Sequence, residues 1–178
     1  MQAEVEELLR SNIRVIEDWP IQGVQFKDLT GLMADGAAFS AVIAEINRAL
    51  DGQQIDQVIG IEARGFPYGA ALAASRGAGF TTARKPGKLP PEVYSMDYDL
   101  EYGTATLEVH THALGAGTKV VVVDDVLATG GTAGACIDLV RQTGAEVVAL
   151  VVIMEIEFLQ GRAKCDERGV PVISLLRD

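Results

Sequence analysis

Two adjacent aspartates, Asp124 and Asp125, precede a short run of small and hydroxylated residues, Ala128-Thr129-Gly130-Gly131-Thr132. Adjacent carboxylates can accept hydrogen bonds from the neighbouring hydroxyl groups of a sugar. The two glycines permit backbone conformations closed to other residues, so successive N–H groups can converge on one anion while the threonines add hydroxyl donors. A helix that begins near Thr132 would direct its positive end to the same point. The segment is therefore suited to bind a ribose phosphate.

A second group of candidate residues is basic and lies between positions 63 and 91, where the chain has no carboxylate. Its members are Arg64, Arg76, Arg84, Lys85 and Lys88. Cations placed in advance, together with a bound divalent metal, stabilise the charge that builds on a departing pyrophosphate. We interpret Arg64, Arg84 and Lys88 in this way, and Arg76, at the end of an expected helix, as a surface residue.

Strands and helices that alternate along the chain must position these residues. Apolar runs and alternation predict strands at 55–61, 80–83, 104–110, 119–123, 147–154 and 170–176. Helical spacing predicts helices at 5–16, 38–50, 65–76, 132–142 and 158–168. Residues 84–102, which include three prolines, are expected to form a long loop. This order predicts an α/β fold with an open, mainly parallel twisted sheet and helices on both faces.

Composition limits the possible classes of protein. With 178 residues, 48% of them hydrophobic, the chain is expected to form a single domain, 1–178. Its net charge of -10 argues against nucleic-acid and anionic-membrane partners, which would require a basic surface. Cys136 and Cys165 match no metal-binding spacing, and no segment resembles a targeting or membrane-spanning sequence. We therefore expect a reduced, cytoplasmic protein.

Other phosphate-binding and acidic motifs fit the sequence poorly. Gly87-Lys88 is followed by leucine, so it is no Walker A loop. The pair Gly115-x-Gly117 precedes its expected strand, whereas a dinucleotide-binding fingerprint must follow one. A phosphoacceptor receiver domain would need a further aspartate on a neighbouring strand and would have no use for the Gly/Thr turn.

The strand, acid pair and Ala-Thr-Gly-Gly-Thr segment together resemble the PRPP-binding motif of type I phosphoribosyltransferases. The resemblance implies that Asp124 and Asp125 hold the ribose hydroxyls and that Ala128 to Thr132 bind the 5′-phosphate. Two further segments resemble adenine phosphoribosyltransferases, namely their pyrophosphate loop at Glu62-Ala63-Arg64-Gly65-Phe66 and the start of their mobile lid at Arg84-Lys85-Pro86-Gly87-Lys88-Leu89-Pro90. By this resemblance the pyrophosphate-binding residues are Ala63, Arg64, Arg84 and Lys88.

The resemblance also covers the lid, about 84–104, and an N-terminal hood, about 1–35. Asp99-Leu100-Glu101-Tyr102-Gly103 matches the end of the lid, which implies that Glu101 is an acid or base near the purine and that Tyr102 lies near the reacting centre. Three neighbouring acids, Glu92, Asp97 and Glu108, are interpreted as solvated. The hood implies an adenine pocket made by Val24, Phe26, Lys27 and Val126, with Phe26 and Val126 on opposite faces of the base. Many relatives have arginine at Lys27 and leucine at Val126.

Overall, the resemblance extends from about residue 13 to 176 and implies a Mg²⁺-dependent, homodimeric enzyme of purine salvage. Such an enzyme joins adenine to PRPP and releases AMP and pyrophosphate, with Mg²⁺ held mainly by PRPP and water rather than by protein ligands. Two alternatives stay open: a transferase for another 6-substituted purine, and a catalytically silent PRPP-binding regulator. The regulator would ordinarily need a DNA-binding domain and a basic face, and the sequence offers neither.

Overall fold

The computed structural model describes residues 3–19, 21–99 and 103–178. Contacts along the chain divide it into two compact units, Met1–Arg48 and Ala49–Asp178. The organisation as one domain with a hood of about 35 residues stays a prediction.

The N-terminal unit contains three helices and a hairpin: α1 (Ala3–Ser11), β1 (Arg14–Glu17), β2 (Gln25–Asp28), α2 (Thr30–Ala34) and α3 (Gly36–Ala49). The predicted helix over 38–50 is confirmed by α3. The expectation that the first helix continues to Ile16 is wrong. The Asn12 amide group donates to the Leu8 carbonyl and the helix ends there, so that Ile16 instead pairs with Phe26 in the antiparallel hairpin.

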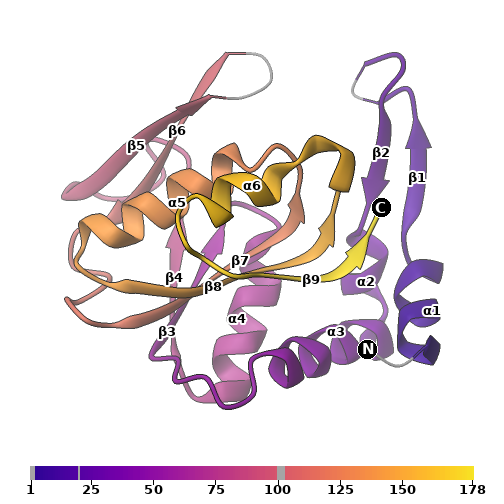
Figure 1. Ribbon diagram of the computed structural model, residues 1–178, viewed down its shortest axis with the longest axis horizontal. Helices are drawn as coiled ribbons and strands as arrows, with labels where there is room; N and C mark the ends of the chain where they lie inside the picture. Colours follow the sequence, from indigo (N-terminus) through magenta and orange to yellow (C-terminus); the bar gives the residue numbers. More distant parts are fainter. Residues whose placement is uncertain (1–2, 20, 100–102) are drawn as a thin grey trace. The chain divides into compact units, whose positions relative to one another are not determined.

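The C-terminal unit is built on a five-stranded sheet with the order β4-β3-β7-β8-β9 (Figure 1). Its strands are β3 (Gln57–Ile61), β4 (Gly79–Ala83), β7 (Lys119–Leu127), β8 (Glu146–Glu155) and β9 (Val172–Arg177). All neighbouring pairs are parallel. The predicted α/β fold with a mainly parallel sheet is confirmed.

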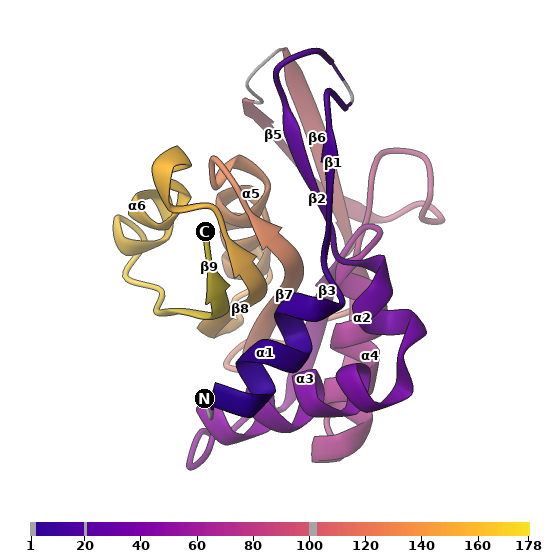
Figure 2. The same cartoon turned by 90° about the vertical axis from the view of Figure 1, so that its right-hand side faces the viewer.

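Helices cover both faces of this sheet. Figure 2 shows α4 (Gly65–Arg76) on one face and α5 (Gly131–Gln142) with α6 (Gly161–Asp166) on the other. The α4 crossover leads outward from β3 to β4, whereas the α5 crossover leads from β7 in the opposite direction to β8. The strand order therefore reverses between β3 and β7. Open α/β sheets bind ligands at the carboxyl ends of the strands at such a point.

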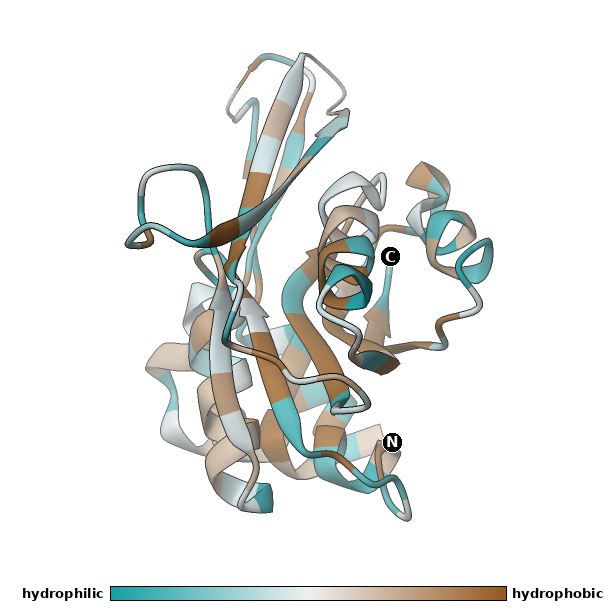
Figure 3. Cartoon of the chain, turned by 90° about the vertical axis from the view of Figure 1, so that its left-hand side faces the viewer, coloured by the Kyte–Doolittle hydropathy of each residue, from teal (hydrophilic) through white to brown (hydrophobic). Residues whose placement is uncertain are grey.

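The core lies between the sheet and its helices. Val120, Val121, Val122 and Val123 of β7 have no exposed surface, as expected for a central parallel strand covered on both faces. Figure 3 shows hydrophobic residues gathered along the strands of this sheet. Both cysteines, Cys136 and Cys165, are buried free thiols. Within the described ranges, no helix has the length and apolar character needed to cross a membrane.

Two further strands, β5 (Val93–Asp99) and β6 (Thr104–His110), pair as an antiparallel hairpin. The strand at 104–110 was expected, but the interpretation of 84–102 as one long loop is wrong for β5. Met96 and Tyr98 alternate on one side and pack against the core, while Asp97 accepts a hydrogen bond from Thr106 across the hairpin. Three prolines and closely spaced acids obscured this alternation in the sequence.

The last predicted helix, 158–168, is interrupted. A 3-10 turn, η1 (Glu157–Leu159), is separated from α6 by Gln160, whose φ of 54° lies in the left-handed region. Because a left-handed residue stops a right-handed helix, the continuous pattern of the sequence gives two short elements.

Candidate active site

The two acids of the first motif lie within β7, directly after the last residue of β7 that pairs with β3. Pairing between β3 and β7 stops at Gly60 and Val123, but β7 continues beside β8 as far as Leu127. The expected strand end at Val123 was therefore too early. Asp124 and Asp125 consequently stand at the carboxyl edge of the sheet, next to the segment that follows β3.

Arg64 connects these two segments. Its Nε atom lies 2.7 Å from Oδ2 of Asp125, whose residue is only 3% exposed, while 40% of the Arg64 side chain remains accessible. A methyl group at Gly65 would stand 3.2 Å from Cα of Asp124, so the start of α4 rests directly on β7. This close packing brings the residue that precedes α4 to the acid pair.

The acid pair is electrostatically unfavourable when both carboxyls are ionised. Burial and the neighbouring Asp125 charge raise the pKa of Asp124 well above its usual range. Burial also raises the pKa of Asp125, although Arg64 opposes that shift. The Asp125 amide donates to Oδ1 of Asp124 at 2.9 Å, which fixes the direction of the first carboxyl. Hydroxyl donors that approached this pair would stabilise its charged form.

The glycine- and threonine-rich segment forms a pocket of about 80 Å³ behind the acids. It is lined by Asp124, Val126, Leu127, Ala128, Thr129, Gly130, Gly131, Thr132, Ala133 and Val152. Gly130 has a φ of 75°, a conformation that favours glycine, and α5 begins at the next residue. The amides at the start of this 12-residue helix therefore surround the pocket, in an arrangement that attracts anions.

Arg84 lies beside the segment after β3. Its Nε atom donates to Oε2 of Glu62 at 3.2 Å, the Lys85 amide donates to the same oxygen at 3.0 Å, and the guanidinium lies 5.7 Å from the ring centre of Phe66. Burial acts to raise the pKa of Glu62, but the Lys85 amide and Arg84 outweigh it and hold that pKa below its usual value. Glu62 thus joins the two basic segments, a role that was not assigned from the sequence.

Lys88 is held near Arg84 through the backbone. Arg84 donates to the Lys88 carbonyl at 3.3 Å, and the Gly87 amide donates to Oε2 of Glu108 at 3.2 Å. Beyond its interpretation as a solvated acid, Glu108 thus contacts Gly87 through its carboxylate, and its backbone pairs with Arg84. The structure brings Ala63, Arg64, Arg84 and the backbone of Lys88 to one end of the sheet.

The catalytic candidates Glu101 and Tyr102 lie outside the described residues. The hairpin that leads to them is described up to Asp99 on β5 and from Gly103 before β6. Among the residues that are described, no group of three or more His, Cys, Asp or Glu side chains is arranged to hold a metal ion.

Three of the four candidate adenine-binding residues lie in the N-terminal unit, on or beside β2. The ring of Phe26 packs edge to face against Trp19, with centroids 4.3 Å apart, and Val24 is exposed. At the end of β2, Asp28 accepts hydrogen bonds from Arg14 and from both the amide and hydroxyl of Thr30. The fourth candidate, Val126, lines the pocket of the C-terminal unit. Trp19 was not singled out from the sequence.

Comparison with known proteins agrees with this arrangement. The family model of the phosphoribosyl transferase domain matches residues 27–169. An adenine phosphoribosyltransferase of Chloroflexus aurantiacus is 49% identical over 95% of this chain and 96% of its own length. One from Streptomyces coelicolor is 50% identical, with 97% and 96% covered.

Solved structures give the same result. The crystal structure of adenine phosphoribosyltransferase from Thermoanaerobacter pseudethanolicus superimposes with a TM-score of 0.93 at 45% identity, covering 98% of this chain and 99% of that one. The enzyme from Saccharomyces cerevisiae gives a TM-score of 0.91 at 35% identity, covering 98% and 100%. With the sheet, the edge site and these relatives in agreement, the chain belongs to the phosphoribosyl transferase domain family and, within it, to the adenine phosphoribosyltransferases.

Proposed function

We propose that this chain transfers the 5-phosphoribosyl group of PRPP to adenine, a reaction of purine salvage that gives AMP and pyrophosphate. The proposal rests on one observation: Arg64, the acid pair and the glycine-rich pocket lie together where the strand order of the sheet reverses. The Saccharomyces cerevisiae relative was crystallised with adenine and an imino-altritol bisphosphate, and the Giardia lamblia relative with 9-deazaadenine. These complexes support adenine as the base.

Asp124 and Asp125 accept hydrogen bonds from the ribose hydroxyls, and Ala128 to Thr132 bind the 5′-phosphate. The raised pKa values of the two acids support this role. Burial deprives the carboxylates of hydrogen bonds to water, and two hydroxyl donors would replace those hydrogen bonds. The small pocket at the start of α5 supports the second role, since its lining includes the first residues of that helix and the two threonines, Thr129 and Thr132.

Ala63, Arg64, Arg84 and Lys88 bind the pyrophosphate. The partly exposed guanidinium of Arg64 beside Asp125, and the position of Arg84 beside Glu62, support this assignment. The cofactor is Mg²⁺, held mainly by PRPP and water, with the acid pair acting on the ribose hydroxyls nearby. When bound, the metal neutralises charge on the leaving pyrophosphate. The preplaced cations of the protein stabilise the same charge.

In the reaction, N9 of adenine forms a bond to C1 of the ribose while the bond from C1 to the pyrophosphate oxygen breaks, with inversion at C1. The bonding electron pair of the broken C1–O bond leaves with pyrophosphate, and adenine loses the proton of its imidazole ring. Glu101 is the candidate acid or base for this proton and Tyr102 lies near the reacting centre. A lid at about 84–104 excludes water from the oxocarbenium-like transition state.

The family resemblance assigns adenine binding to Val24, Phe26, Lys27 and Val126, with Phe26 and Val126 as the residues that stack on the base. The ring of Phe26 is held edge to face by Trp19, which supports its use as a rigid stacking surface. Lys27 and Val126 stand where many relatives have arginine and leucine. The smaller valine and the loss of a planar guanidinium affect base affinity rather than the phosphosugar site.

The enzyme acts as a homodimer in the cytoplasm and has no nucleic-acid or membrane partner. The homodimer follows from the family resemblance. The net charge of -10 supports the lack of nucleic-acid and anionic-membrane partners, and the two free thiols support a reducing compartment. The proposed activity is tested by a steady-state assay with PRPP and Mg²⁺ that offers adenine, hypoxanthine, guanine and xanthine in turn. We expect AMP formation and a strong preference for adenine, because a pocket built for its amine leaves polar groups unpaired with an oxopurine. A preference for any oxopurine would favour the other transferase, and tight PRPP binding without turnover would favour the regulator.

A further inference from the structure

Gly161, the first residue of α6, faces the glycine-rich pocket from behind. A methyl group on Gly161 would stand 2.8 Å from the amide nitrogen of Gly130 and would collide with the Ala128 carbonyl. A methyl group on Gly130 would in turn stand 3.0 Å from Cα of Gly161. The two backbones therefore touch without an intervening side chain. Gly161 itself does not line the pocket.

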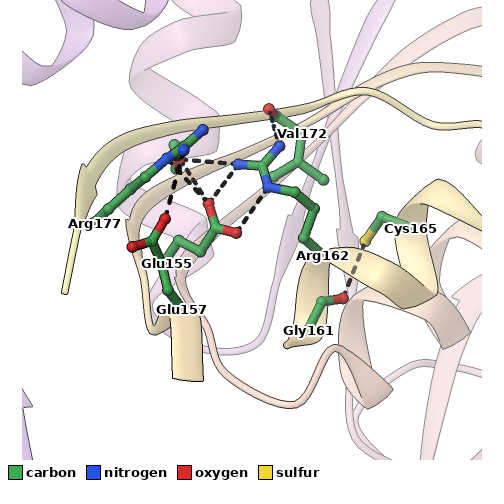
Figure 4. Close-up of polar contacts among 8 residues, drawn as sticks. Glu155, Glu157, Gly161, Arg162, Cys165, Val172 and Arg177 are labelled. Carbon is green, nitrogen blue, oxygen red and sulfur yellow. Dashed lines mark hydrogen bonds and ion pairs between the residues drawn. The ribbon is translucent and has the colours of Figure 1, made fainter. Parts of the chain in front are cut away.

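The residue next to Gly161 is fixed to the ends of two strands. Figure 4 shows the Arg162 guanidinium against Glu155, to which Nε donates at 2.8 Å. Its remaining nitrogens donate to the Val172 carbonyl at 2.9 Å and to Ser174 Oγ at 3.2 Å, and a second contact joins it to Glu155. Glu155 is 4% exposed and also accepts from Ser174. This cluster joins α6 to both β8 and β9.

Arg168, just beyond the other end of α6, is fixed to α5. Arg168 donates to both carboxylate oxygens of Asp138 at 2.7–3.0 Å and to the Lys164 carbonyl at 2.8 Å. Asp138 belongs to α5, whose first residues line the pocket. Short as it is, α6 is therefore anchored at both ends, and Gly161 is held against the pocket between these two anchors.

We propose that Gly161 and the Glu155–Arg162 ion pair are positioning residues for the 5′-phosphate pocket, an inference that rests on the proposed function. Residues 128–131 are alanine, threonine and two glycines, and such small side chains need an external surface to hold their amides in one arrangement. The backbone of Gly161 provides that surface, and the ion pair sets its position. None of the three residues contacts the ligand; they act through the backbone of Ala128 and Gly130.

Gly161→Ala tests the contact directly. We expect the dissociation constant for AMP, measured by titration calorimetry, to rise roughly tenfold or more, because overpacking must displace the pocket backbone. Adenosine shares the base and ribose but lacks the phosphate, so its affinity should stay within about twofold of wild type. Gly115→Ala is the matched control, since a methyl group there meets only Thr118 Oγ1 at 3.5 Å.

Arg162→Lys tests the ion pair without leaving Glu155 unpaired in the interior. Lysine keeps the charge but cannot reproduce all the hydrogen bonds to Val172 and Ser174. AMP affinity should therefore fall roughly several-fold, while adenosine affinity should stay unchanged. Arg48→Lys is the matched control, because Arg48 also pairs with a buried glutamate, Glu45, but lies in the N-terminal unit.

The outcomes separate the two proposals. Wild type that binds neither AMP nor adenosine contradicts the proposed function and this inference with it. Wild-type binding of both, with unchanged AMP affinity in folded Gly161→Ala and Arg162→Lys, overturns the positioning role alone. Equal losses for AMP and adenosine also overturn it, because they indicate general destabilisation. If Gly161→Ala does not fold, Arg162→Lys decides by the same comparison.

Discussion

The Nε atom of Arg64 lies 2.7 Å from Oδ2 of Asp125, and this contact joins the segments that follow two different strands. Arg64 lies in the segment that joins β3 to α4, and Asp125 stands near the end of β7; β3 and β7 are the two strands at which the strand order of the sheet reverses. A buried carboxylate and a partly exposed guanidinium are thus held together where a sugar diphosphate could contact both. The same arginine stabilises the acid and offers its outer side to an anion.

Arg64→Gln is expected to lower kcat/KM by about 100-fold or more, the loss typical when a preplaced donor to a charged transition state is removed. Stability should fall by about 1–3 kcal/mol because the buried Asp125 loses its cation. Arg64→Lys keeps a charge but not the planar fork, so it should recover stability more fully than activity. Steady-state kinetics and denaturant unfolding measure the two effects. Wild-type activity in Arg64→Gln would exclude a role in pyrophosphate binding.

Asp124→Asn is expected to stabilise the free protein above about pH 4 by an amount on the order of 1 kcal/mol while reducing PRPP turnover. Burial and Asp125 raise the pKa of Asp124 above its ordinary 3.8, so its ionised form opposes folding. Below the unfolded pKa the carboxyl is neutral in both states, and the gain should disappear there; it should grow as pH rises through the folded pKa. Urea unfolding at several pH values tests this. A loss of stability at neutral pH would show that Asp124 is not under electrostatic strain.

The sequence predicted the sheet well, and it placed the candidate phosphosugar residues at the sheet edge, because both depend on local patterns. Four consecutive valines before two acids identify a buried strand that leads to a sheet edge. The glycines that follow mark the position of the turn. Helix α4 was expected with the bounds that the structure gives, Gly65–Arg76. In these segments the local preference and the tertiary structure agree.

The remaining features depend on contacts between segments that are distant in sequence. Ile13 and Ile16 continue the helical spacing of α1, yet Ile16 pairs with Phe26, and no pattern within residues 5–16 indicates that partner. Glu62 and Gly161 have roles only because Arg84 and Ala128 approach them in the fold. For Glu62, an acid directly after an apolar strand was an available signal; for Gly161, we find none in the sequence.

Glu62→Gln is expected to weaken PRPP binding several-fold, roughly, because Arg84 and the Lys85 amide lose their shared carboxylate. The folded pKa of Glu62 is lowered, so its contribution to stability is present above the ordinary value of 4.5 and is lost as pH falls through the folded value. The variant should therefore be less stable than wild type at neutral pH by about 0.5–1.5 kcal/mol, and this difference should shrink in acid. Identical pH–stability curves for the two proteins would contradict the lowered pKa.

Asp28→Asn is expected to destabilise the N-terminal hairpin by an amount on the order of 1 kcal/mol at neutral pH. Hydrogen bonds from Thr30 and Arg14 lower the pKa of Asp28 to about 2 from 3.8. This stabilisation is complete above the unfolded pKa and disappears as pH falls through the folded pKa, so wild type and variant should converge between about pH 4 and pH 2. Hydrogen exchange of the β1 and β2 amides reports the local effect. Unchanged exchange at neutral pH would argue against Asp28 as the anchor of the hairpin.

The most direct measurement is a crystal structure of the complex with AMP. We expect the 5′-phosphate within hydrogen-bonding distance of the amides of Thr129 to Thr132, and both ribose hydroxyls on Asp124 and Asp125. A phosphate bound at any other part of the chain, with those amides left to solvent, would contradict the assignment of this sheet edge as the active site.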